Sequence, residues 1–101
     1  MTGSVHHQSM DGVKLDKAVG ILNARLGDCE GKKRVFTVGD CYRDFGAGMT
    51  WTTIMCDSGG GFGGYQFLYP NEWEALEKAD TDEAVDKVID GLVARVMKTG
   101  Y

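Results

Sequence analysis

The C-terminal part of the chain carries the most regular hydrophobic pattern, and this pattern limits the folds that the chain can adopt. Apolar residues recur there at intervals of three and four: Val85, Val88, Ile89, Leu92, Val96 and Met97. This spacing places them on one side of an α-helix and predicts a helix with one buried face. Asp80 with Glu83 is typical of the start of such a helix, and Gly100 is its expected end. A helix of this kind needs a second layer to cover its apolar side.

A second helix is predicted near the N-terminus, over residues 11–26. Its apolar positions have the same periodicity: Leu15, Ala18, Val19, Leu22 and Leu26. Gly27 is the expected end, because glycine adopts the left-handed conformation without steric cost. The spacing places Lys14, Lys17 and Arg25 on the solvent-facing side.

Three runs rich in β-branched and aromatic residues predict strands at 34–38, 50–56 and 65–69. Residues 27–33 are expected to form a polar turn, and residues 40–48 a connection. In the third strand the period of two places Tyr65, Phe67 and Tyr69 on one face.

Pro70 is expected to end the third strand, because proline cannot continue a ladder. Asn71 with Glu74 then predicts the start of a short helix whose apolar members are Trp73 and Leu76. The resulting order is α-β-β-β-α-α. It predicts an α+β fold with a three-stranded antiparallel sheet packed against helices in two layers. Residues 1–10 are expected to be a flexible tail, and residues 11–101 a single domain.

Length and composition exclude several classes of protein. The chain has 101 residues, which suits one domain, and no apolar run is long enough to cross a membrane. The N-terminus lacks the pattern of a secretory signal. The 3 cysteines are an odd number without a Cys-x-x-Cys pair, so we expect free thiols in the cytoplasm and no metal site.

A glycine-rich stretch, CDSGGGFGGYQF at residues 56–67, offers several candidate sites. A serine nucleophile at Ser58 would need a histidine base, but His6 and His7 lie on the expected tail. A phosphate loop would lead into a helix, whereas these glycines join two strands. We therefore expect no enzyme activity and no cofactor, and interpret residues 57–64 as a contact loop anchored by Phe62.

The same stretch overlaps the aromatic strand signature of RNA-recognition domains, in which rings stack on bases. Gly60 replaces the leading basic residue, and Gly64 replaces one stacking aromatic. The element order is also similar to that of double-stranded-RNA-binding domains, but those present lysines where this chain has acids. Binding of single-stranded nucleic acid through Tyr65 and Phe67 stays an alternative, and direct nucleic-acid binding is not the main expectation.

The net charge of −4 is distributed unevenly. Residues 72–90 hold eight acids and two lysines, a net charge of −6, and the remainder of the chain carries +2. An acidic surface opposes contact with a phosphate backbone and favours a basic surface on a partner protein or nucleoprotein complex. With the loop and strand aromatics, the acids make up the expected partner-binding residues: Phe62, Tyr65, Glu72, Glu74, Glu77, Asp80, Asp82, Glu83, Asp86 and Asp90.

In element order, length and acidic C-terminal half, the chain resembles small phage-encoded inhibitors of the anti-CRISPR type. The resemblance involves no sequence motif, so it transfers no residue roles. It implies a non-enzymatic inhibitor that occupies a CRISPR-type nuclease complex in the host cytoplasm, several such proteins being DNA mimics. An accessory subunit or an immunity partner is equally compatible with the composition. The chain is expected to be a monomer or a homodimer.

Overall fold

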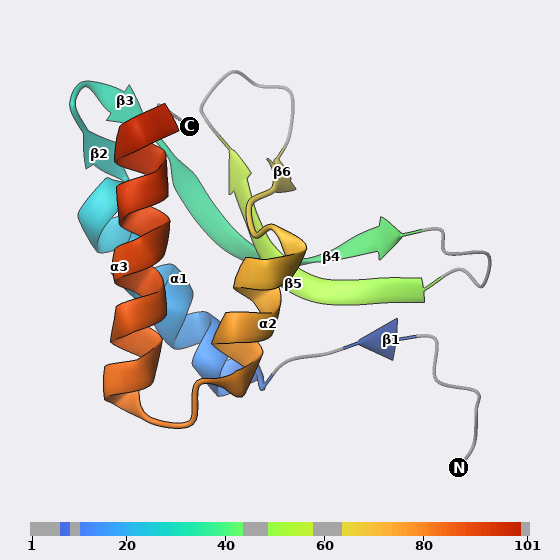
Figure 1. Cartoon of the computed structure of the whole chain (residues 1–101). Helices are drawn as coiled ribbons and strands as arrows, with labels where there is room; N and C mark the ends of the chain where they lie inside the picture. The colour runs from blue at the N-terminus through green and yellow to red at the C-terminus, as the bar shows by residue number, and fades with distance from the viewer. Residues whose placement is uncertain (1–6, 9–10, 44–48, 58–63, 100–101) are drawn as a thin grey trace, which may run out of the picture.

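The computed structural model describes residues 7–8, 11–43, 49–57 and 64–99 (Figure 1). Its elements follow in this order: β1 (His7–Gln8), α1 (Gly12–Leu26), β2 (Asp28–Cys29), β3 (Lys32–Lys33), β4 (Val35–Arg43), β5 (Met49–Asp57), β6 (Tyr65–Gln66), α2 (Pro70–Lys78) and α3 (Asp82–Thr99). Within these residues, no helix is long and apolar enough to cross a membrane.

β5 is the central strand of the main sheet. β4 runs antiparallel to it along its whole length, from the pair Val35–Asp57 to the pair Arg43–Met49. The other edge of β5 is shared, because β1 pairs in parallel with its beginning and β6 pairs antiparallel with its end. The predicted α+β fold, with a three-stranded antiparallel sheet (β4, β5 and β6) packed against helices, is confirmed.

Between β1 and β6, the edge of β5 is closed by residues that follow β6. The Phe67 amide donates to the Ile54 carbonyl at 2.9 Å, and Trp73 Nε1 donates to the Thr52 carbonyl at 2.8 Å. A tryptophan side chain thus satisfies a strand carbonyl that a neighbouring strand would otherwise take. This contact also fixes α2 against the sheet.

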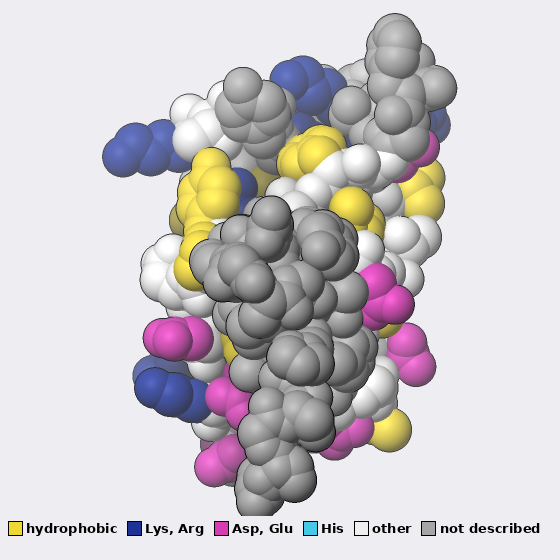
Figure 2. Space-filling view, turned by 90° about the vertical axis from the view of Figure 1, so that its right-hand side faces the viewer, with side chains coloured by type: hydrophobic (Ala, Val, Ile, Leu, Met, Phe, Trp, Pro, Cys, Tyr) yellow, Lys and Arg dark blue, Asp and Glu magenta, His cyan; other side chains and the backbone are white. Residues whose placement is uncertain are grey.

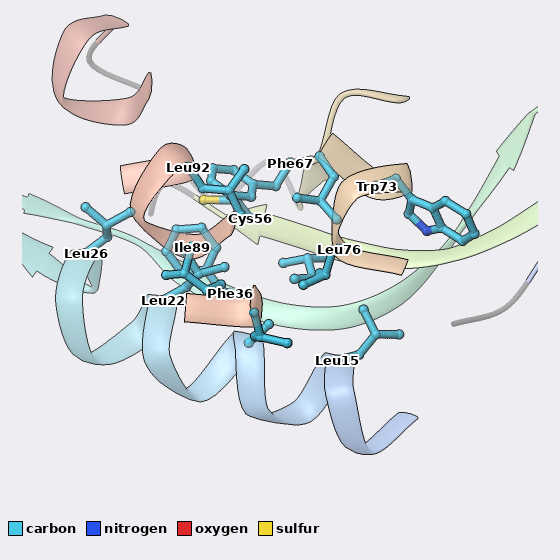
Figure 3. Close-up of a cluster of buried hydrophobic side chains, with 14 of the residues drawn as sticks. Leu15, Leu22, Leu26, Phe36, Cys56, Phe67, Trp73, Leu76, Ile89 and Leu92 are labelled. Atoms are coloured by element: carbon cyan, nitrogen blue, oxygen red, sulfur yellow. The ribbon is translucent and has the colours of Figure 1, made fainter. Parts of the chain in front are cut away.

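The core lies between the helices and one face of the sheet (Figure 3). Phe36, Ile54 and Cys56 alternate along β4 and β5 toward the helices, while Val35 and Thr37 on the opposite face are exposed. The helices contribute a larger set of buried apolar residues: Leu15, Ala18, Leu22, Leu26, Trp73, Leu76, Val85, Ile89, Leu92 and Val96. The rings of Phe36 and Phe67 meet edge to face with their centroids 4.9 Å apart.

The third strand is shorter than predicted. β6 ends at Gln66, and the chain then turns into α2, whose first residue is Pro70. Tyr65, Phe67 and Tyr69 therefore do not share a face: Phe67 is buried, while Tyr65 and Tyr69 are exposed. The expectation that Asn71 begins α2 was also wrong, since the cap is Tyr69, whose amide donates to Glu72 Oε1 at 2.8 Å.

The other element boundaries differ from the prediction in small ways. α3 begins at Asp82, because Thr81 Oγ1 accepts the Ala84 amide at 3.1 Å. Gly27 ends α1 in a right-handed conformation, with φ −60°, so the predicted left-handed cap was wrong. Glycine is needed there for space, because a Cβ would collide with the Asn23 carbonyl oxygen.

Three segments predicted to lack regular structure contain strands. β4 continues to Arg43, so the predicted connection over 40–48 begins with strand residues. His7–Gln8 forms β1, so the interpretation of residues 1–10 as a tail fails there. The polar turn over 27–33 contains the hairpin β2–β3, whose two loop residues, Glu30 and Gly31, have φ of 55° and 78°. Two positive φ values are typical of the tight turns that match strand twist.

Candidate functional site

The start of α1, the end of α2 and the start of α3 meet at one end of the molecule, the lower end in Figure 1. A hollow of about 170 Å³ lies at this junction. Its polar lining comes from all three segments: Asp11, Lys14, Lys17, Asp80, Thr81 and Asp82. We call the acids of this end the acidic pole, made up of Asp11, Glu77, Asp80, Asp82, Glu83 and Asp86.

Charged side chains are distributed unevenly over one face of the molecule. Figure 2 shows acidic side chains mostly over the lower half of the visible face, and most of the basic ones near the top. The β2–β3 hairpin at the upper end carries Lys32 and Lys33. Such an arrangement orients the molecule relative to a charged partner before contact.

Three of the pole's acids have local structural roles. Asp11 Oδ1 accepts the Val13 amide at 3.0 Å and so caps α1. Asp82 and Glu83 lie in the first turn of α3, where the helix dipole favours negative charge. Helix capping therefore explains part of the acidic composition.

Basic residues of α1 neutralise part of the acidic segment. Of the three predicted on its solvent-facing side, Arg25 is exposed, whereas Lys14 and Lys17 are half-buried. Lys17 Nζ pairs with Asp82 at 2.5 Å, and Arg25 pairs with Asp90 at 2.7 Å. Lys14 Nζ instead donates to the carbonyls of Leu76 and Glu77, at 3.0 and 2.8 Å, and so caps the end of α2.

All six acids of the pole are exposed, but Asp11 caps α1 and Asp82 pairs with Lys17, which leaves four: Glu77, Asp80, Glu83 and Asp86. None of them forms an ion pair with another residue in the described part of the chain. These four are the carboxylates that the fold leaves available to an external cation.

Glu72 does not belong to this exposed set. Its side chain is only 14% exposed and pairs with Arg95, at 2.6 Å to Nε and 2.9 Å to Nη2. The Arg95 guanidinium also lies 4.7 Å from the centre of the Phe67 ring and 4.4 Å from that of Tyr69. The sequence placed Glu72 among the partner-binding residues, but its contacts are internal and join α2, α3 and the segment after β6.

Glu74 and Asp90 lie away from the pole. Glu74 is exposed on the first half of α2. By the helical period it is on the side of α2 roughly opposite to Glu72, which faces α3. Asp90 is bound to Arg25 on the side of α3 that faces α1. The acids of residues 72–90 therefore do not share one continuous surface.

Tyr65 is 37% exposed on β6, opposite Cys56 on β5. Burial, followed by a hydrogen bond with Cys56, raises the pKa of Tyr65 to about 12. Burial also raises the pKa of the Cys56 thiol, which therefore stays protonated and a poor nucleophile near neutral pH. Phe62 and Ser58 lie outside the described residues, as do the other positions of 58–63.

A groove between α2 and α3 was missed by the sequence reasoning. Its volume is about 290 Å³. The lining combines small and apolar residues with a polar rim: Asn71, Glu72, Ala75, Lys87, Val88, Gly91 and Leu92. Gly91 was the available signal, because a glycine among helix-forming residues leaves open space beside the helix axis.

Comparisons with protein family models, with curated proteins and with solved structures found no match. The described residues contain no group of three or more histidine, cysteine or acidic side chains placed to hold a metal ion. The candidate site is therefore defined by its own geometry alone.

Proposed function

We propose that this protein is a non-enzymatic inhibitor that binds a basic surface of a nucleic-acid-handling complex, of which a CRISPR-type nuclease is the specific candidate. The observation that supports the proposal is the acidic pole, where Glu77, Asp80, Glu83 and Asp86 are exposed and form no ion pair with any residue that the structure describes. Carboxylates presented in this way offer a protein surface the charges that a phosphate backbone would offer.

The experiment compares two double charge reversals. Glu83→Lys with Asp86→Lys changes the pole, and Glu30→Lys with Glu74→Lys changes net charge equally at exposed positions elsewhere. Each variant is immobilised and used to capture proteins from lysate of the native host, and the captured complex is assayed for nucleic-acid cleavage. We expect the pole variant to lose capture and inhibition by at least about tenfold, because both contacts would become repulsive.

The control variant should retain both activities. Equal capture by the wild type and the pole variant would contradict the proposal. Capture that depends on the pole without any inhibition would favour the accessory-subunit or immunity-partner alternative, which the composition also allows.

The nucleic-acid-binding alternative loses one of its two residues. Phe67 is 1% exposed, so its ring is not available to stack on a base. Tyr65 alone stays accessible. A gel shift with single-stranded RNA at low salt tests this alternative directly.

A further inference from the structure

The outer edge of β4 is closed by α1 at one end only. The Arg34 amide donates to the Gly27 carbonyl at 2.9 Å. Two residues further on, the Phe36 amide donates to Asn23 Oδ1 at 2.8 Å, and Asn23 Nδ2 donates to the Phe36 carbonyl at 3.0 Å. The side-chain amide of Asn23 thus pairs with the backbone of Phe36 as a neighbouring strand would.

These contacts show which backbone groups of β4 point away from β5. In an antiparallel ladder the residues alternate between pairing with the neighbour and pointing outward. The backbone N–H and C=O of Phe36 point outward. Those of Val38 and Asp40 do so as well, because the register with β5 is regular from 35 to 43. Within the described part of the chain, neither backbone has a hydrogen-bond partner on this side. Both residues are exposed.

We propose that the β4 edge at Val38–Asp40 binds an extended segment of a partner protein by strand addition, with a basic side chain opposite Asp40. A row of unpaired N–H and C=O groups is a template for another strand. Val38 and Asp40 project on the same side of the sheet, so the segment would place an apolar residue and a basic residue two positions apart. The proposal does not depend on the acidic pole.

The charge of the edge favours a basic segment over a second copy of this chain. Asp40 is exposed, and Thr52 Oγ1 on β5, the strand on the inner side of β4, donates to its Oδ1 at 3.2 Å. Two copies paired about Asp40 would place their carboxylates opposite each other, which is destabilising. If the two copies instead paired about Gly39, each Asp40 carboxylate would face Val38 of the other copy, again without a counter-charge. A partner segment with lysine or arginine opposite Asp40 supplies this counter-charge.

The probe is a blocked peptide, acetyl-TTKTVTT-amide, added to the full-length protein at up to millimolar concentration. Amide hydrogen exchange and chemical shifts are followed residue by residue by NMR. We expect exchange at Val38 and Asp40 to slow at least tenfold, because their outward groups become paired. The matched control, acetyl-TTETVTT-amide, should bind at least tenfold more weakly. The absence of protection at these two amides would overturn the proposal.

Two variants make the test specific. Asp40→Lys should reverse the preference, so that the glutamate peptide protects the edge better than the lysine peptide. Val38→Pro removes an outward N–H without removing a bond to β5, and should abolish peptide binding. Retained binding by a folded Val38→Pro variant, or an unchanged preference in Asp40→Lys, would overturn the proposal. Protection that instead grows with protein concentration in the absence of peptide would identify a second copy as the occupant, and would equally refute it.

Discussion

Tyr65 and Cys56 form the most strongly perturbed titratable pair in the described structure. The two residues are paired across β5 and β6, and burial is the main cause of both pKa shifts. The sequence indicated Tyr65 as a partner-binding residue but gave no reason to connect it with Cys56. The eight positions between them belong to the glycine-rich stretch, and only the register of the strands shows that the two residues are opposite each other.

This pair predicts a loss of stability at alkaline pH. The pKa of Tyr65 is 10.0 in its unperturbed state and about 12 in the fold. The folded state therefore holds its proton more tightly than the unfolded state does. The free energy of unfolding must fall as pH rises from about 10 through 12, and Cys56 adds a loss that begins near its ordinary value of 9.0. Urea unfolding at pH 8 and pH 11 measures the difference.

Tyr65→Phe should reduce this alkaline loss, because the group that titrates is removed. The free energy of unfolding of the Tyr65→Phe variant at pH 8 is the reference from which its own alkaline loss is calculated. An identical fall in wild type and variant would show that the phenol does not control the effect.

At the scale of elements, the sequence predicted each helix and the two long strands, because their patterns are long and periodic. It was wrong where a specific contact, local or tertiary, decides the boundary. Glu72 reaches back to Tyr69 and moves the start of α2 before Asn71. Pairing with β5 orders His7–Gln8, which no local pattern indicates. The acidic segment was recognised from composition, but its division among the pole, Arg95 and α1 depends on packing that the sequence does not show.

Arg95 joins three elements, and this predicts a large effect of its removal. It pairs with Glu72 of α2, donates to the Phe67 carbonyl at 2.8 Å and contacts two aromatic rings. Arg95→Ala would leave a mostly buried carboxylate without its counter-charge, so we expect a loss of about 3 kcal/mol in the free energy of unfolding. Urea denaturation provides the measurement.

The matched control is Arg25→Ala, because Arg25 forms an ion pair that is largely solvent-exposed. Arg25→Ala should lower the free energy of unfolding by less than about 1 kcal/mol. Equal effects of the two substitutions would mean that the Arg95 contacts contribute no more than a surface pair.

For the molecule as a whole, one core connects the helices with the sheet. Buried residues of α1, β4, β5, α2 and α3 form a single cluster. The described structure therefore predicts cooperative unfolding in one transition, as small single domains usually show.

Trp73 provides a local probe of this cooperativity. The chain has 2 tryptophans, so Trp51→Phe leaves Trp73, which is buried in the core, as the only one. Its fluorescence and the far-ultraviolet circular dichroism should follow the same denaturation curve. An earlier fluorescence transition would show that α2 unfolds separately from the rest of the domain.

The cap that Lys14 places on α2 has a consequence for the order of folding. α2 has nine residues, and isolated helices of that length are marginal in water. Its last carbonyls are bound by a side chain more than 60 positions earlier, and Trp73 is held by β5. Both supports require that α1 and the β4–β5 hairpin already be in place. We therefore expect α2 to form late in folding, after α1 and the β4–β5 hairpin that supply both supports.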